Sequence, residues 1–136
     1  MSPAVRKRLF LLAGAGWLVI ALAAARADWP TPEKLSEQRY RLAILTVNAA
    51  DKSFLPDPAA AGGDWDRAYE RLAVDFAARL GPRFDLSAVE ARHREALAGL
   101  ASTRVRLTLF TLAATAALWG LLALLHTGLK KQSRPA

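Results

Sequence analysis

The sequence contains no cysteine. Disulfide bonds, thiolate metal sites, a lipid-modified cysteine anchor and a cysteine nucleophile are therefore excluded. Histidine occurs only twice, at His93 and His126, so a metal site built on imidazole has few ligands to use. The G-x-S-x-G, P-loop and H-E-x-x-H motifs are also missing. We find no catalytic constellation and no motif for a cofactor, and we predict that the protein is not an enzyme.

Acidic residues are absent from both ends of the chain, because all 12 lie between Asp28 and Glu95. Ten of the 19 basic residues share that span, which leaves it with a net charge of 10 − 12 = −2. The other basic residues flank two apolar segments: Arg6, Lys7, Arg8, Arg26, Arg104, Arg106, Lys130, Lys131 and Arg134. The formal charge of +7 thus reflects these flanks and not a basic stripe interleaved with aromatics, and nucleic acid is not an expected partner.

The second apolar segment, residues 107–129, carries no formal charge. At about 1.5 Å per residue, a helix of this length crosses the ~30 Å hydrocarbon layer of a bilayer. Arg104 and Arg106 precede it and Lys130 and Lys131 follow it, where long cationic side chains can reach the membrane surface. We predict a transmembrane helix here.

The first apolar segment, residues 9–25, follows the basic stretch at residues 6–8 and has two interpretations. It is a second transmembrane helix, or it belongs to a cleavable signal peptide over residues 1–27, with Ala25-Arg26-Ala27 at the cleavage site. We favour the uncleaved anchor, because the apolar run exceeds the roughly 7–15 residues of a typical signal peptide. Under both interpretations, the chain from residue 28 onward lies on the far side of the membrane from the cytoplasm.

The distribution of Lys and Arg sets the expected orientation. The basic residues before the first segment predict that residues 1–8 and the tail at residues 130–136 are cytoplasmic. Residues 26–106 would then lie outside the cytoplasm. Richness in Ala, Leu and Arg is typical of GC-rich bacteria, so we expect the inner membrane, with the central domain in the periplasm.

The central span predicts about three helices and no strand. Thr31 and Asp64 are predicted helix caps, for helices over residues 32–50 and from residue 65 to Gly81-Pro82. Ser87 and Glu90 form a capping-box pattern for a third helix, which no proline separates from the second apolar segment, so it could continue into the membrane. The predicted core of this small bundle is Leu35, Leu42, Leu45, Trp65, Tyr69, Leu72, Phe76, Leu80, Val89, Leu97 and Leu100.

The two histidines have a structural and a functional interpretation. His93 lies on the predicted buried face, where a structural role is favoured; Glu90 and His93 could supply two metal ligands, whereas zinc normally takes four. His126 lies near the end of the second apolar segment, either as an interfacial residue or as a cofactor ligand that would need a second ligand from elsewhere.

Two faces of the second segment are candidates for helix packing. At about 100° per residue, one face carries Thr108, Thr111, Thr115 and His126, which can form hydrogen bonds between helices. Small residues mark another face and recur in the first segment, where they allow close approach of a second backbone. These residues are Ala113, Ala116, Gly120 and Ala123, with Gly14, Ala21 and Ala25 in the first segment.

The expected fold is an all-α membrane protein with two transmembrane helices that bracket a small helical domain. The favoured function is a non-enzymatic accessory, assembly or scaffolding subunit of a bacterial inner-membrane complex. Its expected partners are other integral membrane proteins and the lipid bilayer, with a homo-oligomer as a further option. One alternative is a sensor or regulator whose periplasmic domain binds a ligand and biases a partner. Another is a cofactor-binding membrane subunit that uses His126.

Overall fold

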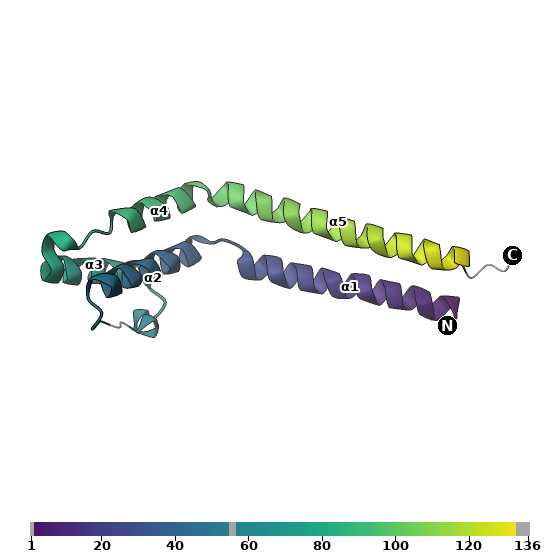
Figure 1. Cartoon of the computed structure of the whole chain (residues 1–136), viewed down its shortest axis with the longest axis horizontal. Coiled ribbons are helices and arrows are strands. Elements are labelled where there is room, and N and C mark those ends of the chain that lie inside the picture. Colours follow the sequence, from purple (N-terminus) through teal and green to yellow (C-terminus); the bar gives the residue numbers. More distant parts are fainter. Residues whose placement is uncertain (1, 55–56, 133–136) are drawn as a thin grey trace. The chain divides into compact units, whose positions relative to one another are not determined.

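A computed structural model of the chain describes residues 2–54 and 57–132, which contain helices and no strand (Figure 1). The predicted all-helical fold is confirmed for these residues. The helices are α1 (Pro3–Asp28), α2 (Pro32–Ala50), α3 (Trp65–Leu80), α4 (Ser87–Ala98) and α5 (Leu100–Gln132), with short 3-10 helices η1 (Pro58–Ala61) and η2 (Gly81–Arg83). Residues Pro30–Ala101 form one compact unit, and the segments on either side of them form another.

The predicted starts of α2 and α3 are confirmed. The Thr31 hydroxyl accepts a hydrogen bond from the Lys34 amide at 3.2 Å, and the Asp64 carboxylate accepts one from the Arg67 amide at 3.2 Å. Each bond satisfies an amide that has no partner within the helix. Gly81 ends α3 with a φ of 56°, a conformation that favours glycine.

The predicted capping box at the start of α4 is wrong. The Ser87 side chain does not cap the helix; instead the Asp85 carboxylate accepts from the Ser87 amide at 2.8 Å. The Glu90 amide donates to the Leu86 carbonyl at 2.9 Å, so the helical bonding begins at Leu86. The Asp85 carboxylate competes with the Glu90 side chain for the Ser87 amide. Because Asp85 is only two residues away, its short side chain reaches this amide easily, which explains why the capping box does not form.

The prediction of one unbroken helix from residue 88 into the second apolar segment is also corrected. Helix α4 ends at Ala98, and Gly99 separates it from α5, which begins at Leu100. The Gly99 amide still donates to the Glu95 carbonyl at 2.9 Å, so the interruption is limited to a single residue. Glycine is a weak helix former because its backbone loses the most conformational freedom on folding, which makes this residue the natural place for the break.

In the unit Pro30–Ala101, α2 packs against both α3 and α4. The buried cluster takes residues from all three helices: Tyr40, Ala43, Val47, Tyr69, Leu72, Phe76 and Val89. The predicted core positions Leu45 and Leu97 are wrong, because their exposed fractions are 65% and 40%. Helix α2 instead buries Ala43 and Val47 completely. The small side chain of Ala43 lets the neighbouring helices approach α2. A prediction that assigns the leucines of α2 to the core cannot identify this position.

Substituting Phe76 should destabilise this unit strongly. The Phe76 side chain is 2% exposed, and its ring lies 4.4 Å from the Phe54 ring and 6.0 Å from the Phe84 ring, centroid to centroid. We expect Phe76→Ala to lower the free energy of unfolding by about 3–5 kcal/mol, because it leaves a cavity in a small core. Hydrogen exchange over residues 32–98 of the full chain in detergent would measure the loss.

Val74→Ala is the matched control on the same helix, since Val74 is 70% exposed. It should change the free energy of unfolding by less than about 0.5 kcal/mol. Equal exchange rates in the two variants would contradict the packing described for α3.

Candidate functional site: the interface between α1 and α5

Helices α1 and α5 are both long and apolar enough to cross a membrane. They lie side by side in one compact unit, and the first turns of α1 are level with the last turns of α5 (Figure 1). Most of their large apolar side chains are exposed, among them Leu12, Val19, Leu109, Phe110 and Leu124. The pairing of the two helices therefore covers only one narrow face of each.

The centre of this interface is a close contact between Gly14 and Trp119. A Cβ atom placed on Gly14 would lie 2.6 Å from a carbon of the Trp119 indole, which is inside van der Waals contact. Close by, the Trp17 indole nitrogen donates to the Thr115 hydroxyl at 3.3 Å. An indole and a hydroxyl thus satisfy each other across the two helices, where water would be scarce in a bilayer.

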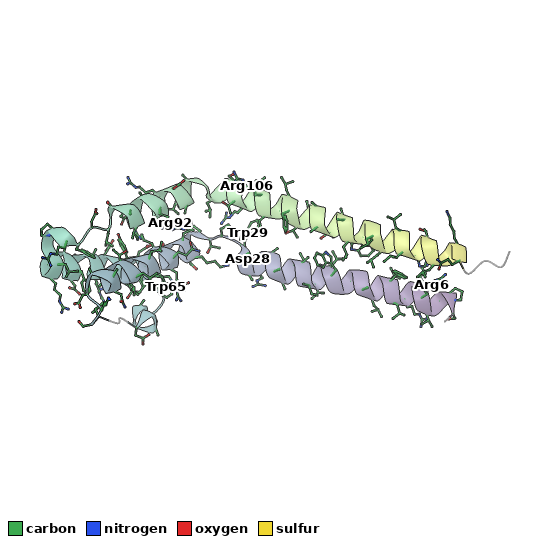
Figure 2. All side chains as sticks on the ribbon, viewed as in Figure 1. Arg6, Asp28, Trp29, Trp65, Arg92 and Arg106 are labelled. Carbon is green, nitrogen blue, oxygen red and sulfur yellow. The ribbon has the colours of Figure 1, made fainter. Side chains whose placement is uncertain are left out.

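Polar and aromatic contacts continue toward the chain ends. The Phe10 and His126 rings meet edge to face with centroids 5.2 Å apart. One turn before Phe10, Arg6 donates from Nη1 to the Leu129 carbonyl at 3.4 Å (Figure 2). This carbonyl belongs to the last turns of α5, where the helix dipole favours a cation.

The other end of the helix pair carries a cation–π contact. Trp29 directly follows α1 (Figure 2). The Arg104 guanidinium carbon lies 5.6 Å from the centroid of the Trp29 ring. Contacts of this kind are attractive because the face of an indole ring is electron-rich. The pairing of α1 and α5 thus has a cationic side chain at each end.

The residues predicted to form the threonine face have different roles in the structure. Thr115 and His126 face α1, as described above. The Thr108 and Thr111 hydroxyls instead donate to carbonyls of their own helix, those of Arg104 at 2.9 Å and Leu107 at 2.8 Å. Such back-bonding satisfies a hydroxyl without a second helix.

The small residues fall into two groups. Those of α1 lie at the interface, with Gly14 and Ala21 buried and Ala25 half-buried. Those of α5 are exposed, and a Cβ placed on Gly120 would meet nothing within 4 Å. We define these exposed residues as the open face of α5: Ala113, Ala116, Gly120 and Ala123.

Sequence reasoning missed the aromatic residues of the interface. Phe10, Gly14, Trp17 and Ala21 are spaced by four, three and four residues, which is the repeat of a helix face that contacts another helix. That spacing was visible in the sequence. Which residue of α5 each would contact was not, because the offset between two helices depends on side-chain shapes.

A groove opens between the two helices near the chain ends, with a volume of about 230 Å³. We call it the terminal groove. It is lined by Lys7, Phe10, Leu11, Trp119, Leu122, Ala123 and His126. Apart from Lys7 and His126 its lining is apolar.

A separate polar cluster lies in the unit Pro30–Ala101 around Arg39, whose side chain is only 15% exposed. Its guanidinium lies 2.7 Å from the Asp66 carboxylate and 3.5 Å from the Glu90 carboxylate, nitrogen to oxygen. The guanidinium carbon also lies 4.1 Å from the centroid of the Tyr69 ring. One arginine of α2 thereby contacts acidic residues on both α3 and α4.

Burial raises the pKa of Tyr69, and the hydrogen bond to the Glu90 carboxylate raises it further. Elsewhere in this unit, a hydrogen bond from the Ser53 hydroxyl lowers the pKa of Asp51, and one from the Ser87 amide lowers the pKa of Asp85. These two carboxylates order local turns by accepting hydrogen bonds, since both bonds favour the charged form.

The predicted metal candidates Glu90 and His93 lie in different surroundings. Glu90 is engaged by Arg39 and Tyr69, whereas His93 is half-buried beside aliphatic residues such as Leu35 and Leu42. Within residues 2–54 and 57–132, no group of three or more His, Cys, Asp or Glu is placed to hold a metal ion.

A pocket of about 200 Å³ lies on the same unit between α2, α3 and the chain near η1. We call it the α2–α3 pocket. Its aromatic wall comes from Tyr40, Phe54 and Phe76, and its charged residues are Asp64, Arg67, Arg71 and Asp75. Both charge signs are present, so the pocket selects no simple ion.

Comparison with known protein families, with curated proteins and with solved structures finds no match to this chain. Its function is therefore inferred from the contacts, exposure and charges of its own residues.

Replacing Gly14 should separate α1 from α5. Gly14→Leu places a side chain where the Trp119 indole lies, so we expect weaker pairing of the helices. The chain has no cysteine, which allows Phe10→Cys and His126→Cys to report on the pairing through a short bifunctional thiol cross-linker. Cross-linking of this pair should fall severalfold in the Gly14→Leu background.

Gly16→Leu is the control, because a Cβ at Gly16 meets nothing within 4 Å. Cross-linking should be unchanged by it. A similar decrease with both leucines would show that general crowding, and not the Trp119 contact, controls the pairing.

The buried Tyr69 phenol should make stability depend on high pH. Since its folded pKa is raised, the neutral form stabilises the fold at pH values below the unfolded pKa of about 10. This contribution is lost as the pH rises above that value. We expect Tyr69→Phe to be less stable by about 1 kcal/mol at neutral pH and to lose less stability between pH 9 and 11. Thermal melts at several pH values across that range measure the effect. If the phenol had no role, the melting temperature would fall equally with pH in the wild type and in Tyr69→Phe.

Proposed function

We propose that this protein is a non-enzymatic accessory, assembly or scaffolding subunit of a bacterial inner-membrane protein complex. Helices α1 and α5 anchor it in the bilayer, and the unit Pro30–Ala101 is presented in the periplasm. The observation that carries this proposal is the division of surface on α5: one face contacts α1, whereas the open face is small, apolar and uncovered.

Membrane insertion is supported by the exposed leucine-rich surface of both helices. Side chains such as Leu12, Leu22 and Phe110 would be unfavourable in water in such numbers, and hydrocarbon is their natural surrounding. A single helix pair satisfies its backbone hydrogen bonds internally, as a bilayer requires.

The contacts of α1 support its role as a retained anchor. The helix continues through the candidate cleavage site at residues 25–27, and Gly14 and Trp17 contact residues of α5. Removal of residues 1–27 would leave the α5 face at Thr115 and Trp119 without its partner. Intact mass of the protein from native membranes distinguishes an uncleaved anchor from a signal peptide.

The basic residues support the orientation. Arg6 and Lys7 on α1 and Lys130 and Lys131 on α5 belong to the paired ends of these helices, since Arg6 contacts the Leu129 carbonyl. Positively charged flanks favour the cytoplasmic side. Both termini are then cytoplasmic.

The open face suits a partner helix from another membrane protein. Ala116 and Gly120 are spaced by four residues, which brings small side chains onto one line and permits close backbone approach. The unit Pro30–Ala101 adds exposed apolar residues of its own, Leu45 and Val74, on different helices. Contacts in the bilayer and outside it can thus act together on one complex.

Affinity purification from native membranes after cross-linking tests this proposal. The wild-type protein should co-purify with other integral membrane proteins, and Gly120→Leu should reduce their recovery on the order of tenfold, because overpacking a helix interface costs about 1–3 kcal/mol. Within the chain itself the new side chain meets nothing, so folding should be retained.

Gly128→Leu is the matched control, since it also adds a leucine to α5 in open space but on a different face. Recovery of partners should match the wild type. Loss of partners with both variants, or with neither, would contradict a role for the open face.

A second candidate function is a sensor or regulator, which the α2–α3 pocket favours. Its aromatic wall and its charged residues of both signs could hold a small ligand that has apolar and charged groups. In the same purification, a single substoichiometric partner in place of a stable complex would favour this alternative.

A further inference from the structure

We propose that the terminal groove holds an acyl chain of an acidic phospholipid, with the basic residues at its mouth binding the phosphate. This inference rests on the proposed insertion of α1 and α5 into the membrane. It adds a specific lipid partner to that function.

The lining of the groove suits hydrocarbon. Phe10, Leu11, Trp119 and Leu122 supply apolar walls, and Ala123 leaves room between them. Trp119 and His126 are seven positions apart, which corresponds to about 10 Å along the helix axis, so the groove is elongated along α5. A narrow apolar channel parallel to the helices has the direction that lipid chains take in a bilayer.

The mouth of the groove suits an anion. Lys7 lines it, and Arg6 belongs to the same turn. All charged side chains near this end are basic, because the acidic residues of the chain lie between Asp28 and Glu95. Basic pockets at the cytoplasmic ends of membrane helices are known to bind acidic lipid headgroups.

Two buried nitrogen atoms in this region also lack a hydrogen-bond partner among the described residues. Within residues 2–54 and 57–132, Nε of Arg6 and Nδ1 of His126 have no hydrogen-bond partner. The two residues belong to adjacent turns of the interface, since Arg6 contacts the Leu129 carbonyl and His126 contacts Phe10. A phosphate oxygen can accept from the Arg6 Nε–H, and from His126 Nδ1 in the tautomer that carries its proton there, which would offset the cost of leaving these atoms unpaired.

The charge at the mouth favours lipid over a protein helix as the occupant. A partner helix packed over Lys7 would have to bury its ammonium group, which is costly in a membrane. An acidic lipid instead brings a negative charge to this position and an apolar chain to the groove. A zwitterionic lipid brings its own cation and gains less.

Native mass spectrometry of the full chain tests the proposal. The protein is released from nanodiscs that contain equal amounts of phosphatidylglycerol and phosphatidylcholine, and the retained lipids are identified. We expect phosphatidylglycerol to be retained preferentially, and Lys7→Gln to lower this preference about fivefold, the effect of one cationic group near an anionic surface.

Arg8→Gln removes the same charge from an exposed neighbour that does not line the groove, and it should leave the preference intact. Equal retention of the two lipids by the wild type would overturn the proposal. An equal effect of the two substitutions would also overturn it, since diffuse surface attraction would then explain the preference.

Filling the groove is an independent test. Ala123→Phe should displace the retained lipid, whereas Ala117→Phe, at an exposed position of α5 outside the groove, should not. Unchanged lipid retention with Ala123→Phe would show that the lipid binds outside the groove and would overturn the proposal. A lipid-free dimer in the wild-type spectrum would overturn it too, because a second copy of the chain would then be the occupant of the groove.

Failure of membrane insertion can be recognised separately. Single cysteines at Val19 and Leu112 should be protected from water-soluble thiol reagents if the helices lie in the bilayer. Labelling of both cysteines would contradict the proposed function and this inference together. Protection of both cysteines without any lipid preference would contradict this inference alone.

Discussion

The pairing of α1 and α5 depends on the contact between the Trp119 indole and the backbone at Gly14. Because a Cβ at Gly14 would lie 2.6 Å from the indole, the large side chain of one helix lies directly on the backbone of the other. This contact fixes the offset of the helices, and with it the Trp17–Thr115 hydrogen bond and the Phe10–His126 ring contact on either side. The terminal groove depends on this contact as well, since Trp119 is one of its lining residues.

The two units are stabilised by different physical means. In the unit Pro30–Ala101, a small apolar core is supplemented by Arg39, a cation that contacts Asp66 on α3 and Glu90 on α4. Burial makes such contacts sensitive to the loss of one partner, because the remaining charge is then unpaired. The contacts described between α1 and α5 are of another kind: the fit of Trp119 on Gly14, the Phe10–His126 ring contact and hydrogen bonds to uncharged acceptors. The contacts between uncharged groups at the centre of the pair would suit the interior of a bilayer, in which a charge is costly.

Sequence patterns predicted the features that depend on local chemistry. The caps at Thr31 and Asp64 and the glycine end at Gly81 followed from side-chain and backbone preferences over a few residues. Features that depend on competition or on shape were missed. At the start of α4 the Asp85 carboxylate accepts from the Ser87 amide, the bond that the capping box assigns to Glu90, and Ala43 takes the buried position in place of Leu45. Likewise, the small residues of α1 were recognised, but the tryptophan that covers Gly14 was not, since its position depends on the offset between helices.

Trp119 also links the two surfaces proposed for α5. Its side chain is 38% exposed although its ring covers Gly14, so one edge remains available beyond the interface. Trp119 lines the terminal groove and directly precedes Gly120 of the open face, and Ala123 belongs to both surfaces. A lipid chain in the groove and a partner helix on the open face would therefore meet around the same residues. Binding of one would change the apolar surface offered to the other, which would couple the lipid composition of the membrane to assembly of the proposed complex.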